Sequence, residues 1–129
     1  MKILIIEDNE HNLYLARYLL EARGHEITDA RAGPEGIAAA NKSPPELILL
    51  DIELPQMDGY TVARVLRENP RLDTVPIAAV TSYAMNGDRV KALESGCDAY
   101  IEKPIDPDSF ATVVEAILAA GRRRQGDKT

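Results

Sequence analysis

Short apolar runs alternate with amphipathic stretches along the whole chain. Five of the runs have the length and composition of strands: Lys2–Ile6, Glu26–Asp29, Leu47–Leu50, Ile77–Val80 and Ala99–Ile101. The first, third and fourth runs are nearly all apolar, which is typical of parallel strands covered on both faces. We therefore expect these three strands to lie in the middle of a sheet.

Apolar residues at helical spacing predict a helix after each strand. The first four helices are expected around Leu13–Leu20, over Pro34–Asn41, around Val62–Leu66 and over about Met85–Ser95. The fifth is predicted with Asp106 as its N-cap, Pro107 at its first position and its end at Gly121. Its apolar stripe consists of Phe110, Val113, Val114, Ile117 and Leu118.

Strands that alternate with helices are typical of α/β domains built on a parallel sheet. We predict one doubly wound (βα)5 domain over residues 1–121, and because connections are short and right-handed, few topologies of its parallel sheet remain. No linker rich in Gly, Ser or Pro separates a second domain. Residues 122–129 are expected to form a short basic tail that is disordered.

Composition excludes several classes of protein. The 129 residues are 45% hydrophobic and 28% charged, a balance typical of one globular domain. The longest apolar runs are far shorter than the roughly 20 residues of a membrane span, and no secretory signal is visible. Because Cys97 is the single cysteine, no disulfide can form within the chain, and we expect a cytoplasmic protein.

The charge of the chain argues against nucleic-acid binding. The formal net charge is −6 at pH 7. Residues 1–120 alone carry 11 basic and 20 acidic side chains, a net charge of −9. Such an acidic body repels a phosphate backbone, so we expect no nucleic-acid partner.

Reactive side chains follow the ends of the predicted strands. Glu7-Asp8 follows the first strand, Asp51 the third, Thr81 the fourth and Lys103 the fifth. In an open parallel sheet, ligands bind outside the carboxyl ends of the strands. We therefore expect three carboxylates, a hydroxyl and an ammonium group to meet in one cleft.

These residue types indicate a chemistry. Three neighbouring carboxylates repel one another, so the cluster should hold a proton or a cation. Oxygen ligands favour Mg²⁺, whereas Zn²⁺ is excluded because no pair of Cys or His has ligand spacing. The sequence has no P-loop and no Gly-x-Gly-x-x-Gly after the first strand. With Lys103 to pair with a phosphoryl oxygen, the cluster indicates phosphoryl transfer to a carboxylate.

Four segments, in this order along the chain, resemble the receiver domains of two-component response regulators, the CheY-like superfamily. They are Glu7-Asp8, the loop from Asp51 to Gly59, Thr81-Ser82, and the lysine segment from Tyr100 to Pro104. The resemblance covers residues 2–120, and it implies a flavodoxin-like sheet of five parallel strands in the order 2-1-3-4-5. In the stretch 81–88 the chain is most similar to single-domain regulators of the DivK type and to the receivers of hybrid kinases.

The resemblance implies that Asp51 is the phosphoacceptor. It would attack the phosphoryl group of a partner's phosphohistidine and form an acyl phosphate. The partner would be a histidine kinase or a histidine phosphotransfer protein. Mg²⁺ would be bound by Asp8, Asp51 and the backbone carbonyl of Glu53, with Glu7 acting through water.

The resemblance also implies a switch. Thr81 and Lys103 would bind phosphoryl oxygens, and Tyr100 would change rotamer when Thr81 moves. Lys103–Pro104 would be a cis peptide, which only an X-Pro bond makes inexpensive. The surface of the fourth helix, fifth strand and fifth helix would then differ between the two states and regulate a downstream protein.

Two residues near the phosphoacceptor, Glu53 and Tyr83, are not the small, neutral residues that would leave it accessible to water. Glu53 and Tyr83 are bulky and flank the path of an attacking water molecule, so we expect them to modulate the lifetime of the phosphoryl group. The leading hypothesis is a stand-alone response regulator, favoured by Met1 directly before the first strand. Such a protein is not an enzyme, beyond catalysing its own phosphorylation and dephosphorylation. Alternatives are a receiver from a hybrid kinase, a phosphorylation-independent adaptor and an FMN-binding flavodoxin-like protein.

Overall fold

The computed structural model describes residues 1–82 and 86–122, and within them it has one five-stranded parallel sheet. The strand order is β2-β1-β3-β4-β5, as the sequence predicted. The strands are β1 (Lys2–Ile6), β2 (Glu26–Ala30), β3 (Leu47–Asp51), β4 (Ile77–Thr81) and β5 (Ala99–Glu102). Because β3 and β4 each run one residue further than expected, Asp51 and Thr81 are the last residues of their strands.

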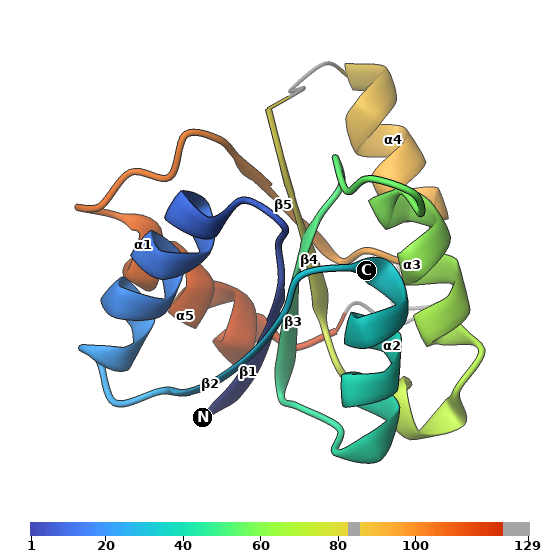
Figure 1. The fold of residues 1–129 in the computed structure, drawn as a ribbon, viewed down its shortest axis with the longest axis horizontal. Helices are drawn as coiled ribbons and strands as arrows, with labels where there is room; N and C mark the ends of the chain where they lie inside the picture. The colour runs from blue at the N-terminus through green and yellow to red at the C-terminus, as the bar shows by residue number, and fades with distance from the viewer. Residues whose placement is uncertain (83–85, 123–129) are drawn as a thin grey trace.

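Helices cover both faces of the sheet, as Figure 1 shows. On one face lie α1 (Glu10–Glu21) and α5 (Phe110–Ala120). On the other lie α2 (Gly33–Lys42), α3 (Gly59–Arg67) and α4 (Asn86–Glu94), with a 3-10 turn, η1 (Pro70–Leu72), after α3. Over the described ranges, none of the helices combines the length and the apolar character that crossing a bilayer requires.

Alternation along the strands divides the core into two layers. Ile3 and Ile5 pack with the apolar faces of α1 and α5, whereas Leu4 and Ile6 pack with those of α2 and α3. All five residues of β3 are buried, as expected for a central parallel strand. Successive residues of a strand therefore face opposite sides of the sheet and hold different helices against it, which makes the sheet rigid.

The start of the last helix was predicted wrongly. The helix begins at Phe110, with Ser109 as its N-cap residue, and not after Asp106. The carboxylate of Asp106 accepts hydrogen bonds from the Asp108 N–H at 3.0 Å and the Ser109 hydroxyl at 3.1 Å, so it closes a turn instead of capping a helix. Val113, expected in the apolar stripe, is exposed.

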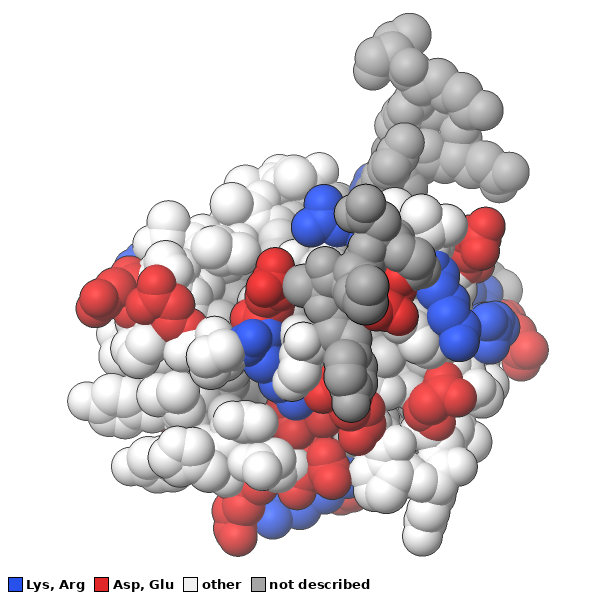
Figure 2. All heavy atoms as spheres, turned by 90° about the horizontal axis from the view of Figure 1, so that it is seen from above, with Lys and Arg blue, Asp and Glu red and all other residues white. Residues whose placement is uncertain are grey.

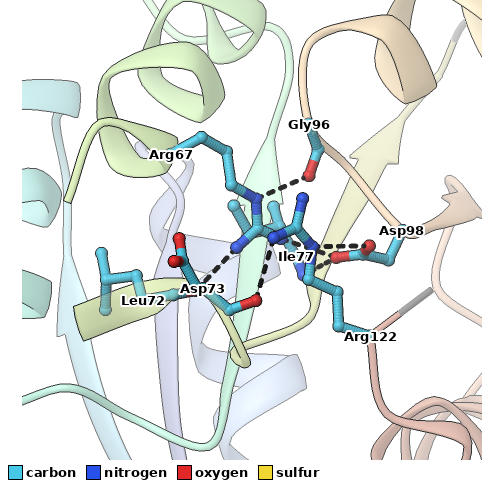
Figure 3. A network of polar contacts seen from close by, with 7 residues as sticks. All are labelled: Arg67, Leu72, Asp73, Ile77, Gly96, Asp98 and Arg122. Atoms are coloured by element: carbon cyan, nitrogen blue, oxygen red, sulfur yellow. Dashed lines mark hydrogen bonds and ion pairs between the residues drawn. The ribbon is translucent and has the colours of Figure 1, made fainter. Parts of the chain in front are cut away.

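A buried ion pair joins α3 to the amino ends of β4 and β5 (Figure 3). The Arg67 and Asp98 side chains are only 12% and 7% exposed, and Arg67 Nη2 lies 2.7 Å from Asp98 Oδ2. Arg67 also donates to the backbone carbonyls of Gly96 and Leu72, at 3.0 and 2.8 Å. Asp98 Oδ2 accepts the Ile77 N–H at 2.9 Å. Each charge is thus hydrogen-bonded as well as paired, which offsets much of its desolvation.

Arg122, the first residue of the expected basic tail, belongs to the same network. Its Nε lies 3.3 Å from Asp98 Oδ1, and its Nη1 donates to the backbone carbonyl of Asp73 at 2.9 Å. The chain just beyond α5 is therefore tied to the start of β5. The remainder of the tail, residues 123–129, lies outside the described residues.

We expect Asp98→Ala to lower the free energy of unfolding by about 3 kcal/mol, because it leaves the buried Arg67 charge unpaired. Urea unfolding followed by circular dichroism measures the change. Asp73→Ala is the matched control: it keeps the backbone carbonyl that Arg122 uses, and should change stability by less than about 0.5 kcal/mol. A loss of similar size in the two variants would contradict the role given to the Arg67–Asp98 pair.

Candidate functional site

The predicted site residues meet at the carboxyl edge of the sheet. Glu7 follows β1 and donates its N–H to the carbonyl of Ala30 at the end of β2, at 2.9 Å. Asp51 ends β3, and the Lys103 N–H bonds the carbonyl of Thr81 at the end of β4, at 2.8 Å. Figure 2 looks down on this edge, where Asp and Glu side chains gather with a few Lys and Arg among them.

Three carboxylates form a cluster that suits a hard cation. Glu7, Asp8 and Asp51 each offer one oxygen within 4.8 Å of the others. Glu7 and Asp51 are 5% and 2% exposed, while Asp8 is exposed and leaves the cluster open to solvent. Oxygen-only ligands with one side open fit Mg²⁺, which keeps several waters. The residues present therefore fit the metal that the sequence predicted.

Glu7 is the carboxyl most affected by this crowding. Its Oε2 accepts the Asn9 N–H at 3.1 Å, which fixes the side chain in the cleft. Burial, followed by hydrogen bonding and repulsion from Asp51, raises the pKa of Glu7 to about 7. Without a cation, the Glu7 carboxyl is therefore partly protonated near neutral pH.

Lys103 is the positive centre of the site. Its Nζ lies 3.1 Å from Asp51 Oδ1, 3.4 Å from Glu7 Oε1 and 3.8 Å from Glu53 Oε1. Burial alone would lower the pKa of Lys103, but the carboxylates of Glu7 and Asp51 outweigh it and raise the pKa. The ammonium group therefore stays charged. The peptide bond between Lys103 and Pro104 is cis.

The loop after β3 is shaped so that it supports Asp51. The Glu53 N–H donates to Asp51 Oδ1 at 2.9 Å, and the Gly59 N–H donates to the Ile52 carbonyl at 3.0 Å. A Cβ at position 59 would lie 2.5 Å from the Ile52 Cα, closer than real Cβ contacts come. Glycine thus lets the start of α3 close onto the end of β3, which leaves the Asp51 carboxylate oriented by the loop.

The Glu53 side chain makes contacts that the sequence did not indicate. Its Oε2 accepts hydrogen bonds from the Thr81 hydroxyl and from the Ser82 N–H, the latter at 2.7 Å. Sequence reasoning assigned the Glu53 backbone carbonyl a role as a Mg²⁺ ligand, but its side chain only the role of an obstacle to water. The backbone N–H of Ser82 carries no signal in the sequence, although its position one residue past β4 could have suggested a donor facing the cleft.

Tyr100 lies outside the carboxylate cluster. It stands opposite Ala79 in the register of β4 and β5, and its ring packs against the core layer under α2, α3 and α4. The Arg89 guanidinium lies 5.2 Å from the ring centroid. Tyr83, the other aromatic residue that the sequence singled out, lies outside the described residues.

Comparison with known proteins decides the family. The family model described as the response regulator receiver domain matches residues 3–115. The chain belongs to the response regulator receiver family. It is 40% identical over 116 residues to the polar-differentiation response regulator DivK of Brucella ovis, a match that covers 90% of this chain and 94% of that protein.

Solved structures agree with this assignment. A CheY-like receiver domain protein from Methanospirillum hungatei has a TM-score of 0.83 and 30% identity, over 92% of this chain and 94% of the other. The receiver domain of a sensor histidine kinase from Pseudomonas aeruginosa has the same TM-score and identity, over 92% and 97%, and holds magnesium in its active-site cleft. The chain is therefore a signalling switch of the two-component type, and the FMN-binding alternative is wrong.

Proposed function

We propose that Asp51 accepts a phosphoryl group from the phosphohistidine of a histidine kinase or histidine phosphotransfer protein. An Asp51 carboxylate oxygen attacks phosphorus in line, the P–O bond forms as the P–N bond breaks, and the imidazole leaves with the N–P electron pair. The observation that carries the proposal is the position of Asp51: buried at the end of β3, yet 3.1 Å from the Lys103 ammonium.

The surrounding groups support this transfer through charge. Asp8, Asp51 and the backbone carbonyl of Glu53 would hold Mg²⁺, with Glu7 acting through water. The metal supplies positive charge that offsets the repulsion between the carboxylates and the incoming phosphoryl group. The Lys103 ammonium group lies between the carboxylates of Glu7 and Asp51, so it can stabilise a phosphoryl oxygen other than the one bound to the metal. Thr81 donates its hydroxyl to a third oxygen.

The output of the switch is a protein surface. Thr81 ends β4, and Tyr100 on β5 stands opposite Ala79, two residues before Thr81. A change at Thr81 therefore reaches Tyr100 through these neighbouring strands. Helix α4, which packs against β5, exposes Val90 and Leu93, and α5 exposes Val113. We infer a protein partner for this surface, and not nucleic acid, since the body of the domain is acidic. A cytoplasmic location agrees with such partners.

We further propose that the protein acts as a stand-alone regulator. The observation that favours this is the match to DivK, which extends over 94% of that relative, so the relative is itself about the size of one receiver domain. The second candidate is a receiver that belongs to a hybrid kinase, favoured by the similarity to the Pseudomonas kinase domain. The length of the intact gene product, measured by immunoblotting of cells, distinguishes the two.

We expect acetyl phosphate to label Asp51 only when Mg²⁺ is present, because repulsion from the carboxylates blocks the donor otherwise. Intact-mass spectrometry detects the adduct. Asp51→Asn and addition of EDTA should each abolish it. Asp108→Asn, which removes an exposed carboxylate before α5, should be labelled like the parent. An adduct that persists in Asp51→Asn would refute the assignment of the phosphoacceptor.

The acyl phosphate should be lost slowly. Glu53 and Tyr83 flank the path of the attacking water in our proposal, and the negative charge of Glu53 disfavours hydroxide-like attack. The double variant Glu53→Asn, Tyr83→Ala should therefore shorten the half-life by more than about twofold, measured by loss of the adduct mass after removal of the donor. An unchanged half-life would mean that these flanking side chains do not control hydrolysis.

Phosphorylation should alter the α4–β5–α5 surface through the Thr81 hydroxyl. Thr81→Ala should still be phosphorylated, yet should lose the amide shifts across residues 86–105 that the parent shows on phosphorylation. Thr81→Ser, which keeps the hydroxyl, is the control and should retain them. If phosphorylated Thr81→Ala shows the same shifts as the parent, the signal leaves the site by another route.

A further inference from the structure

We propose that the Glu53 carboxylate occupies, before transfer, the hydrogen-bond donors that the phosphoryl group needs, and that it must leave them for phosphorylation to proceed. The inference rests on the proposed function of Asp51. It assigns Glu53 a part in the forward reaction, as a resident competitor for the phosphoryl-binding groups. This is separate from any effect on hydrolysis.

The contacts of one oxyanion carry the inference. Glu53 Oε2 accepts both the Thr81 hydroxyl and the Ser82 N–H, and Oε1 lies 3.8 Å from Lys103 Nζ. A hydroxyl, a backbone amide and an ammonium group are the donors expected around a phosphoryl group. Lys103 Nζ also lies 3.1 Å from Asp51 Oδ1, so the Glu53 carboxylate and the phosphoacceptor share this ammonium group.

The position of Glu53 allows displacement. Its side chain is 27% exposed, in the loop after β3, so the carboxylate can rotate toward water without unpacking the core. The Glu53 N–H remains bound to Asp51 Oδ1 through the backbone, so the loop keeps its shape when the side chain leaves. The contacts that hold the carboxylate are therefore ones that an incoming oxyanion can replace.

These contacts have a kinetic consequence. When only a fraction of the molecules has these hydrogen-bond donors available, the rate of phosphorylation at a low phosphodonor concentration falls to that fraction of its full value. Hydrogen bonds to a charged acceptor are strong enough that this fraction is roughly one tenth or less. Thr81 also has an acceptor in the cleft before the phosphoryl group arrives, so phosphorylation exchanges one oxyanion for another at this hydroxyl.

The rate of phosphorylation by acetyl phosphate with Mg²⁺ tests the competition. We expect Glu53→Ala to react roughly tenfold faster than the parent, with Glu53→Gln in between because it keeps the side-chain volume but loses the charge. The matched control is Glu102→Gln. Glu102 is exposed and stands opposite Thr81 in the strand register, so this control removes the same charge nearby.

Two further conditions separate displacement from general repulsion. The acceleration should persist at about 1 M salt, where long-range repulsion is screened, and should appear also with phosphoramidate, which carries less negative charge than acetyl phosphate. An acceleration equal in Glu102→Gln, or lost at high salt, would overturn the inference. So would equal rates in the parent and both Glu53 variants.

A readout without phosphorylation tests the contact itself. In donor-free buffer the Ser82 amide resonance should shift upfield in Glu53→Ala, because the amide loses a carboxylate acceptor, and Glu102→Gln should leave it unchanged. An unmoved Ser82 amide in an otherwise native spectrum would overturn the inference. If neither the parent nor any variant forms an adduct, the function proposed for Asp51 is wrong and the role of Glu53 falls with it. If adducts form at equal rates, only the role of Glu53 is wrong.

Discussion

The site is organised by one ammonium group held among carboxylates. Lys103 Nζ lies within 4 Å of an oxygen of Glu7, Asp51 and Glu53, and without this charge the acids would repel one another in a partly buried cleft. Even with it, burial, followed by hydrogen bonding and repulsion from Asp51, raises the pKa of Glu7 to about 7. The clustered oxygens of Glu7, Asp8 and Asp51 suit a divalent metal.

Parallel strand geometry brings these charges together. Each strand ends at the same edge, and the order of the sheet places the ends of β1, β3, β4 and β5 in sequence along that edge. Short backbone contacts then fix the details: the Lys103 N–H to Thr81, and the tight return of the loop at Gly59.

This explains what the sequence could and could not predict. Apolar runs fix the strands, and polar residues just past them fix the edge, so Glu7, Asp51, Thr81 and Lys103 follow from pattern alone. The contact of Glu53 with Ser82 depends on a side-chain rotamer and a backbone donor, neither of which a pattern encodes. The start of α5 was missed because Asp106 closes a turn and caps no helix, and N-cap residues suit both.

The contacts of β4 and β5 differ between the two ends of these strands. At the amino ends of β4 and β5, Asp98 exchanges backbone and side-chain hydrogen bonds with Ile77 and is paired with Arg67. At the carboxyl ends of the same two strands lie Thr81 and Lys103, whose side chains contact the carboxylates of Glu53 and Asp51. In the proposed function, strands anchored at one end and exchangeable at the other would transmit a change of acceptor into a displacement of β5 and α4, while the core between them keeps its packing.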